Sequence, residues 1–109
     1  MTGLIETWST DPSEEDSMTD EHAWIWREMI RCLPEGDMSG AKVLDIGCNQ
    51  GGFLRMLYDT RPFKAGVGVD LAKDRVALAE AAKGDRPITY TATNRPADAG
   101  TDFDWAFSH

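Results

Sequence analysis

A glycine-rich turn between a short apolar strand and a helix is the part of this sequence best suited to chemistry. Residues 43–53 read VLDIGCNQGGF. Gly47 permits a tight turn, and Gly51 or Gly52 lets the backbone approach a ligand closely. Asn49 stands where a further glycine is usual, and asparagine tolerates the left-handed conformation. The helix that follows begins with N–H groups that have no partner within the helix, which suits a carboxylate or a phosphate.

Two acidic residues accompany this turn. Asp70 closes a second apolar run and lies 23 positions after Gly47. An acid at about this distance accepts hydrogen bonds from ribose hydroxyls in nucleotide-binding folds. Asp45 lies inside the first strand, where a carboxylate needs a partner such as a ligand ammonium group. Structural roles remain as alternatives, since Asp70 could cap the next helix and Asp45 could accept hydrogen bonds from backbone N–H groups.

Strands and helices must alternate to position these residues. An N-terminal helix is predicted from Thr19 to about Leu33, and later helices at 52–59 and 71–83. Strands are predicted at 42–46, 65–69, 88–92 and 103–107. The alternation indicates an α/β fold, a Rossmann-like three-layer sandwich with parallel strands ordered 3-2-1-4. Leu71 and Leu78 are expected among the packing residues of the helix at 71–83, whereas residues 93–100 are rich in turn formers and give no strong helix signal.

The last predicted strand reaches almost to the end of the sequence. We therefore expect a fold truncated after strand four, with an open sheet edge. Such an edge would leave backbone groups unpaired and would expose the aromatic side chains of Phe103, Trp105 and Phe107. Self-association through the strand-four edge is the expected consequence.

The net charge of −8 is unevenly distributed. Residues 1–26 contain seven acidic residues and no lysine or arginine. We therefore divide the chain into an acidic, loosely structured arm at 1–18 and a partial domain with an N-terminal helix at 19–109. No basic stripe indicates a nucleic-acid surface. His22 is expected on the surface of the N-terminal helix.

Targeting signals and metal-binding patterns are not apparent in the sequence. No apolar run approaches the ~20 residues of a membrane span, and no signal-peptide pattern begins the chain, so no membrane association is predicted and a cytoplasmic location is expected. Cys32 and Cys48 are isolated, without a Cys/His cluster that would predict a metal site.

Residues 43–53, Asp70 and the FDWAF run at 103–107 together resemble the first half of a class I S-adenosylmethionine-dependent methyltransferase domain. The similarity covers roughly residues 41–109. It implies S-adenosylmethionine as the methyl donor and S-adenosylhomocysteine as the product. It also implies a set of donor-binding residues: Asp45, Gly47, Cys48, Asn49 and Gly51 for the methionine part, Asp70 for the ribose, Leu71, Thr93 and Asn94 for the adenine, and Ser108 near the methyl group.

The resemblance predicts methyl transfer, in which the main task of the protein is to position donor and acceptor. The acceptor is not identified, and no residue is assigned as catalytic. A second interpretation is a non-catalytic donor-binding fragment or pseudoenzyme module that needs a partner. A dinucleotide-binding oxidoreductase domain is less favoured, because Asp45 would repel a pyrophosphate just above it.

Overall fold

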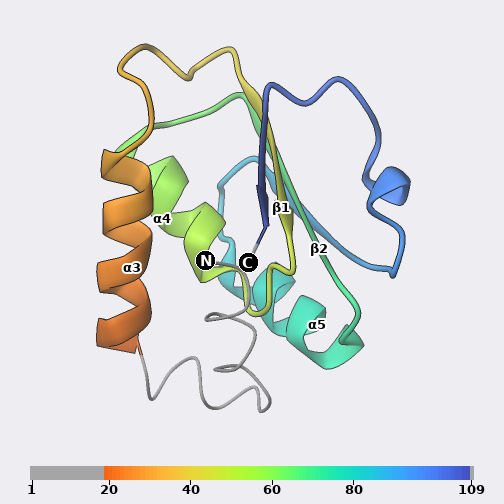
Figure 1. Cartoon of the computed structure of the whole chain (residues 1–109). Coiled ribbons are helices and arrows are strands. Elements are labelled where there is room, and N and C mark those ends of the chain that lie inside the picture. The colour runs from red at the N-terminus through yellow and green to blue at the C-terminus, as the bar shows by residue number, and fades with distance from the viewer. Residues whose placement is uncertain (1–18, 109) are drawn as a thin grey trace.

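Four parallel strands form the central sheet of the computed structural model, which describes residues 19–108 and their side chains from residue 22 onward (Figure 1). The predicted arm at 1–18 and His109 lie outside the described residues. The strands are β1 (Lys42–Ile46), β2 (Ala65–Asp70), β3 (Ile88–Ala92) and β4 (Trp105–Ser108). Their order is β3-β2-β1-β4, which confirms the predicted Rossmann-like α/β topology.

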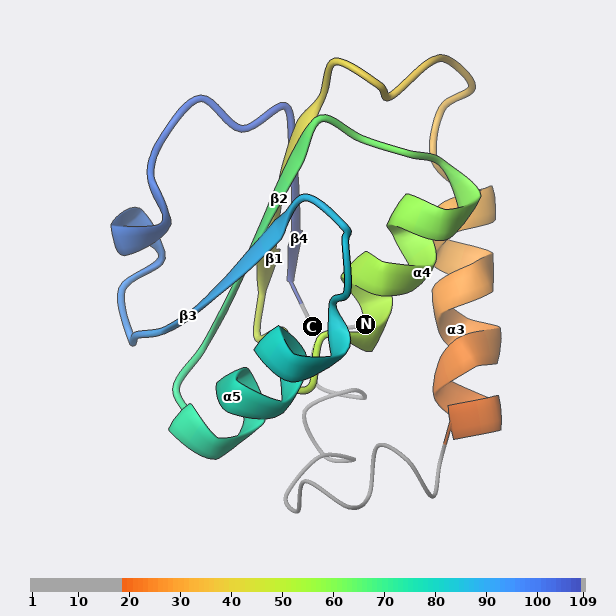
Figure 2. The ribbon, with the colours of Figure 1, turned by 180° about the vertical axis from the view of Figure 1, so that it is seen from behind.

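The helices are α3 (Thr19–Arg31), α4 (Gly52–Thr60) and α5 (Lys73–Ala82), followed by the short 3-10 helix η1 (Pro96–Ala99). Figures 1 and 2 show α3 and α4 on one side of the sheet and η1 on the other. Helix α5 joins the same core as α4 through Val76 and Ala79. Within residues 19–108 the layer opposite the α-helices therefore consists of η1. None of these helices combines the length and hydrophobicity that a bilayer span requires.

The strand register decides which side chains face the α-helices. Phe107, Asp45, Gly68 and Tyr90 are register partners in one row across all four strands. Phe107 and Tyr90 belong to the core that also contains Phe53 of α4, and the Phe53 and Phe107 rings meet edge to face with centroids 4.9 Å apart. Because side chains alternate along a strand, this row and the row through Val43 face the α-helices.

The prediction that Trp105 and Phe107 of β4 are exposed was wrong. Phe107 is buried and Trp105 is partly buried against the core, because the register with β1 places both side chains on the face of the sheet that packs into the core. The strand itself begins at Trp105 rather than at Phe103. Its outer backbone edge has no partner strand in the part of the chain that the structure describes.

Three other side chains differ from expectation. Leu71 and Leu78 are 73% and 46% exposed, because α5 begins at Lys73 and turns Val76 and Ala79, not Leu78, toward the sheet. Leu71 precedes the helix and so takes no part in its packed face. His22 is buried, with its ring centroid 5.6 Å from that of Trp26, because it lies on the inner face of α3.

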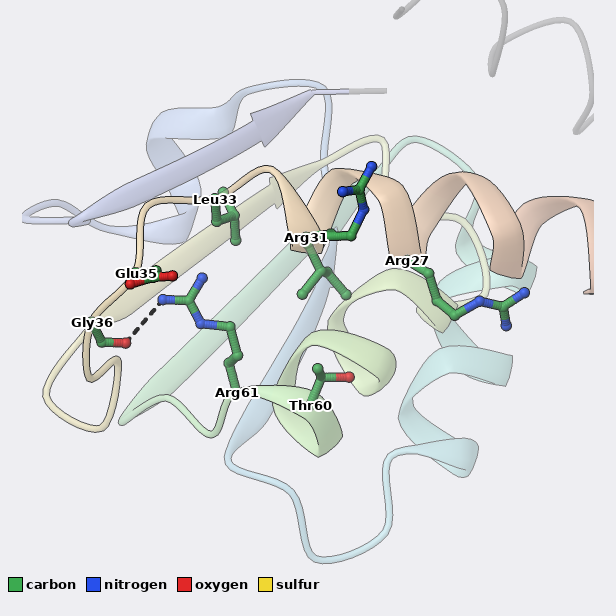
Figure 3. A pocket seen from close by; sticks show the side chains of 8 residues that line it. Arg27, Arg31, Leu33, Glu35, Gly36, Thr60 and Arg61 are labelled. Carbon is green, nitrogen blue, oxygen red and sulfur yellow. Dashed lines mark hydrogen bonds between the residues drawn. The ribbon is translucent and has the colours of Figure 1, made fainter.

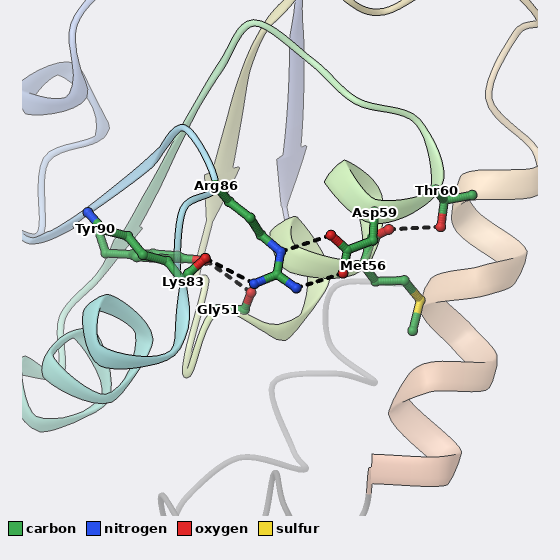
Figure 4. A network of polar contacts seen from close by, with 7 residues as sticks. All are labelled: Gly51, Met56, Asp59, Thr60, Lys83, Arg86 and Tyr90. Carbon is green, nitrogen blue, oxygen red and sulfur yellow. Dashed lines mark hydrogen bonds and ion pairs between the residues drawn. The ribbon is translucent and has the colours of Figure 1, made fainter.

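Helix α4 is held to the segment before β3 by an arginine. The Arg86 guanidinium donates through Nε and Nη2 to the two carboxylate oxygens of Asp59, at 2.9 and 2.7 Å, and through Nη1 to the Lys83 carbonyl (Figure 4). These hydrogen bonds from Arg86 lower the pKa of Asp59. The fork geometry fixes the direction of the end of α4.

Candidate functional site

The turn between β1 and α4 has three residues in the left-handed region. The φ angles are 79° at Gly47, 52° at Asn49 and 82° at Gly51, which explains the glycines and the asparagine. The N–H groups of Gly47 and Cys48 both donate to the Val69 carbonyl, at 2.8 and 3.0 Å. The turn is thus attached to the end of β2 as well as to β1.

The position of this turn in the sheet is that of a ligand site. The strand order reverses at β1, because β2 lies on one side of it and β4 on the other. Ligands of open α/β sheets bind in the crevice at the carboxyl ends of the strands where the order reverses. Ser108 is the register partner of Ile46, directly before the turn, and therefore lies at the same end of the sheet as the turn.

Asp70 joins the turn to the start of α5. Its Oδ2 accepts the N–H of Asn49 at 2.9 Å, and its Oδ1 accepts the N–H of Ala72 at 3.0 Å. A carboxylate has about four lone-pair positions, so each oxygen can accept one further hydrogen bond. The N-cap of α5 is Ala72, without a side-chain cap hydrogen bond, so the alternative that Asp70 caps this helix is wrong. Asp70 instead holds the backbone just before the helix and keeps free capacity to accept a ligand hydroxyl.

Sequence reasoning missed Arg75. Its Nη1 atom donates to Oδ1 of Asn49 at 2.7 Å, from the first turns of α5. The guanidinium thus holds the side chain of Asn49 while Asp70 holds its backbone. Only the basic residue type and its position soon after Asp70 could have pointed to it, because the contact is made between residues 26 positions apart.

Asp45 and Cys48 lie beneath the turn. Asp45 is fully buried on the helix-facing side of β1, and Cys48 is also buried. Cys48 packs in the core, where its thiol lies 3.7 Å from the Asn49 carbonyl oxygen. Both side chains therefore adjoin the turn from the inside of the protein.

The predicted adenine-contacting residues are grouped next to Asp70. The Thr93 N–H donates to the Asp70 carbonyl at 2.9 Å, which brings the loop after β3 to the end of β2. The Thr93 hydroxyl donates to Asp98 at 2.6 Å and accepts the Arg95 N–H, so it is largely engaged with η1. Leu71 and Asn94 are exposed. The predicted site residues thus lie near the carboxyl ends of the strands.

A separate pocket of about 530 Å³ lies at the other end of α4 (Figure 3). It is lined by residues of α3, the loop that follows and the end of α4: Arg27, Ile30, Arg31, Leu33, Glu35, Gly36, Thr60 and Arg61. Arg61 donates to the carbonyls of Pro34 and Gly36, and Arg31 pairs with Glu28. Arg61 thus fixes the loop after α3, and the pocket lies at the opposite end of α4 from the turn.

Comparison with solved structures shows which proteins share this fold. One match is in the complex between the Haloferax volcanii Trm112 methyltransferase activator and a methyltransferase, with a TM-score of 0.65, 26% identity, and coverage of 78% of this chain and 36% of that chain. A second is an S-adenosylmethionine-dependent methyltransferase from Mesorhizobium loti, with a TM-score of 0.59, 30% identity, and coverage of 74% and 38%.

A third match shows the fold alone. It is the magnesium protoporphyrin IX methyltransferase of Synechocystis PCC 6803 with bound S-adenosylmethionine, with a TM-score of 0.64, 20% identity, and coverage of 78% and 42%. No family model matches the sequence, and no curated protein matches it. The chain spans about two fifths of the length of these solved structures.

The described residues have the fold of the N-terminal half of a class I S-adenosylmethionine-dependent methyltransferase domain. This confirms the resemblance predicted from the turn, from Asp70 and from the last strand.

Proposed function

We propose that this chain binds S-adenosylmethionine at the carboxyl ends of β1 and β2 and supplies the donor-binding half of a methyltransferase. The observation that carries the proposal is the double attachment of Asp70. One carboxylate holds the Asn49 N–H of the turn and the Ala72 N–H before α5, and it retains lone pairs for the two ribose hydroxyls.

The residues around the turn fit the parts of this donor. The left-handed backbone at Gly47 lets the methionine part approach without a Cβ in the way. Leu71 offers exposed apolar surface beside Asp70 for the adenine ring. Asn94 remains the candidate for the adenine amino group, since the Thr93 hydroxyl is directed to Asp98. Asp45, Cys48 and Ser108 complete the proposed set.

The donor, when bound, supplies a methyl group on a sulfonium, an already activated leaving group. The residues of this chain then have to orient it: Asp70 fixes the ribose, and the turn fixes the methionine part. Ser108, at the end of β4, would border the methyl group. The contribution that we propose for this chain is therefore the positioning of the donor, and no residue is assigned as catalytic.

A non-catalytic donor-binding module is the second candidate. The chain corresponds to about two fifths of the matched structures, so acceptor binding and activity could require additional polypeptide. Since one matched structure is a complex with the Trm112 activator, we keep a protein partner for this chain as part of the proposal. A cytoplasmic location remains a prediction from the sequence.

Self-association through β4 also remains a proposal. Among the described residues, β4 pairs with β1 only, so its other edge presents backbone donors and acceptors. Sedimentation velocity at several concentrations tests this, and a monomer at all concentrations would contradict it.

The test of donor binding is a calorimetric titration of the 109-residue chain with S-adenosylhomocysteine and, separately, with NAD. We expect binding of S-adenosylhomocysteine and none of NAD. The opposite preference would favour the dinucleotide-binding domain, and absence of both would reject the proposal. A methyl-transfer assay on the chain, with and without additional polypeptide, separates the enzyme from the binding module.

A further inference from the structure

The edge strand β3 reaches the donor turn through one buried tyrosine. The Tyr90 hydroxyl donates to the carbonyl oxygen of Gly51 at 3.1 Å, and this interaction is buried. Gly51 is the residue that caps α4, with φ 82°. Its carbonyl oxygen also accepts the Arg55 N–H at 3.2 Å, the first hydrogen bond of the helix. Both lone pairs of this oxygen are therefore used.

The Tyr90 ring also explains two glycines. A Cβ at Gly51 would lie 2.5 Å from the Tyr90 hydroxyl oxygen, and a Cβ at Gly68 would lie 2.6 Å from Cδ1 of the same ring. The ring thus fills space that is open because both positions lack a side chain. It spans β2 from β3 and contacts the turn from beneath.

Tyr90 is itself fixed at its backbone. Its N–H donates to Oε1 of Glu80 on α5 at 2.7 Å, and Oε2 of Glu80 pairs with Lys83 at 2.7 Å. Figure 4 shows the hydroxyl end of Tyr90 directed at Gly51. The Tyr90 backbone is held by Glu80, its ring is packed in the core, and its hydroxyl is bonded to the turn. The residue can therefore keep the turn in a fixed position.

We infer that Tyr90 is a positioning residue of the donor site, acting on the turn through the carbonyl of Gly51. The inference rests on the proposed function. The turn is held at its beginning by the Val69 carbonyl of β2, which accepts the N–H groups of Gly47 and Cys48. It is held at its end by the Tyr90 hydroxyl, which donates to the Gly51 carbonyl. Without the hydroxyl, the Gly51 carbonyl keeps the Arg55 N–H, so the helix still begins but its first residue gains freedom.

The matched pair Tyr90→Phe and Tyr58→Phe tests this inference in the 109-residue chain. Both substitutions remove one phenolic hydroxyl and keep the ring. Tyr58 lies near the far end of α4, where its ring packs on Phe63 with centroids 5.2 Å apart. We expect Tyr90→Phe to weaken S-adenosylhomocysteine binding about three- to tenfold and Tyr58→Phe to leave it unchanged.

Hydrogen exchange of the folded protein provides a readout that does not depend on the donor. Tyr90→Phe should accelerate exchange at the Gly51 and Arg55 amides relative to the amides of β1 and β2. A role in overall stability alone would accelerate all of these amides together. Equal acceleration throughout, or loss of cooperative unfolding in Tyr90→Phe, would overturn the inference.

The outcomes separate this inference from the proposed function. If the wild type binds S-adenosylhomocysteine and Tyr90→Phe binds it equally well, the inference is wrong and the proposed function stands. If the wild type binds no donor, the proposed function fails. Exchange then decides: unchanged Gly51 and Arg55 amides overturn the inference, and faster exchange supports Tyr90 as the residue that fixes the turn.

Discussion

The carboxylate of Asp70 accepts the backbone N–H of Asn49 at 2.9 Å. This contact joins the end of β2 to the turn after β1, 21 positions earlier in the chain. The acid proposed to hold the ribose and the turn proposed to hold the methionine part are therefore mechanically connected. A change at either residue should affect both parts of the site.

Asp70→Ala should weaken S-adenosylhomocysteine binding at least ~100-fold. Two hydrogen bonds from ribose to a charged acceptor are lost, each worth about 1.5–3 kcal/mol, and the turn loses its attachment. Asp70→Asn keeps one acceptor oxygen and should fall between this variant and the wild type. Calorimetry measures all three. Asp74→Ala, which removes an exposed acid from the first turn of α5, is the control, and equal effects at positions 70 and 74 would contradict the assignment.

Gly51→Ala should destabilise the protein by about 1–3 kcal/mol, because alanine is strained at φ 82° and its Cβ would meet the Tyr90 hydroxyl. A drop of ~5 °C or more in the melting temperature is expected for a domain of this size. Gly40→Ala is the matched control, since no atom lies within 4 Å of its Cβ position. Thermal unfolding followed by circular dichroism compares them, and an unchanged Gly51→Ala melting curve would refute the close contact.

Arg75→Gln should cost more free energy of donor binding than free energy of unfolding. The guanidinium holds the Asn49 side chain at 2.7 Å, and glutamine is too short to reach the same oxygen with the same geometry. An affinity loss of about two- to tenfold is expected from one hydrogen bond. Arg27→Gln, on the exposed face of α3, controls for the loss of positive charge. Identical affinities for both variants would exclude a role for Arg75 in shaping the turn.

The Asp59–Arg86 pair predicts a pH dependence of stability. Hydrogen bonds from Arg86 lower the pKa of Asp59 below its ordinary value of 3.8. The stabilisation is therefore complete above about pH 4 and is lost as the pH falls through the lowered pKa. Because the Asp59 side chain is 55% exposed, the effect should be below about 1 kcal/mol.

Urea denaturation of the wild type and Arg86→Gln at pH 3 and pH 6 measures this contribution. The two proteins should differ at pH 6 and become more similar at pH 3. Asp59→Asn should lower the free energy of unfolding at pH 6 as Arg86→Gln does. The double variant should be no less stable than either single variant. A difference between wild type and Arg86→Gln that grows at low pH would contradict the sign.

The sequence by itself determined the strands, the turn and the acid. The bounds of β1 and β3 agree with the predicted residues 42–46 and 88–92. A short apolar run between turn-forming residues indicates a strand from its own sequence, without knowledge of its partners. The same holds for Gly47, Asn49 and Gly51, whose residue types follow from the left-handed backbone at their own positions. Asp70 was identified because it directly follows a strand.

Tertiary structure decided which side chains face one another. The Tyr90 hydroxyl meets Gly51 across 39 positions, and Arg75 meets Asn49 across 26, through register and packing that no local pattern specifies. Leu71 and Leu78 were misassigned because the alanine-rich α5 defines no strong apolar stripe, so the face that packs depends on where the helix begins. Phe107 was misassigned because pairing with β1, not its own sequence, turns it toward α4.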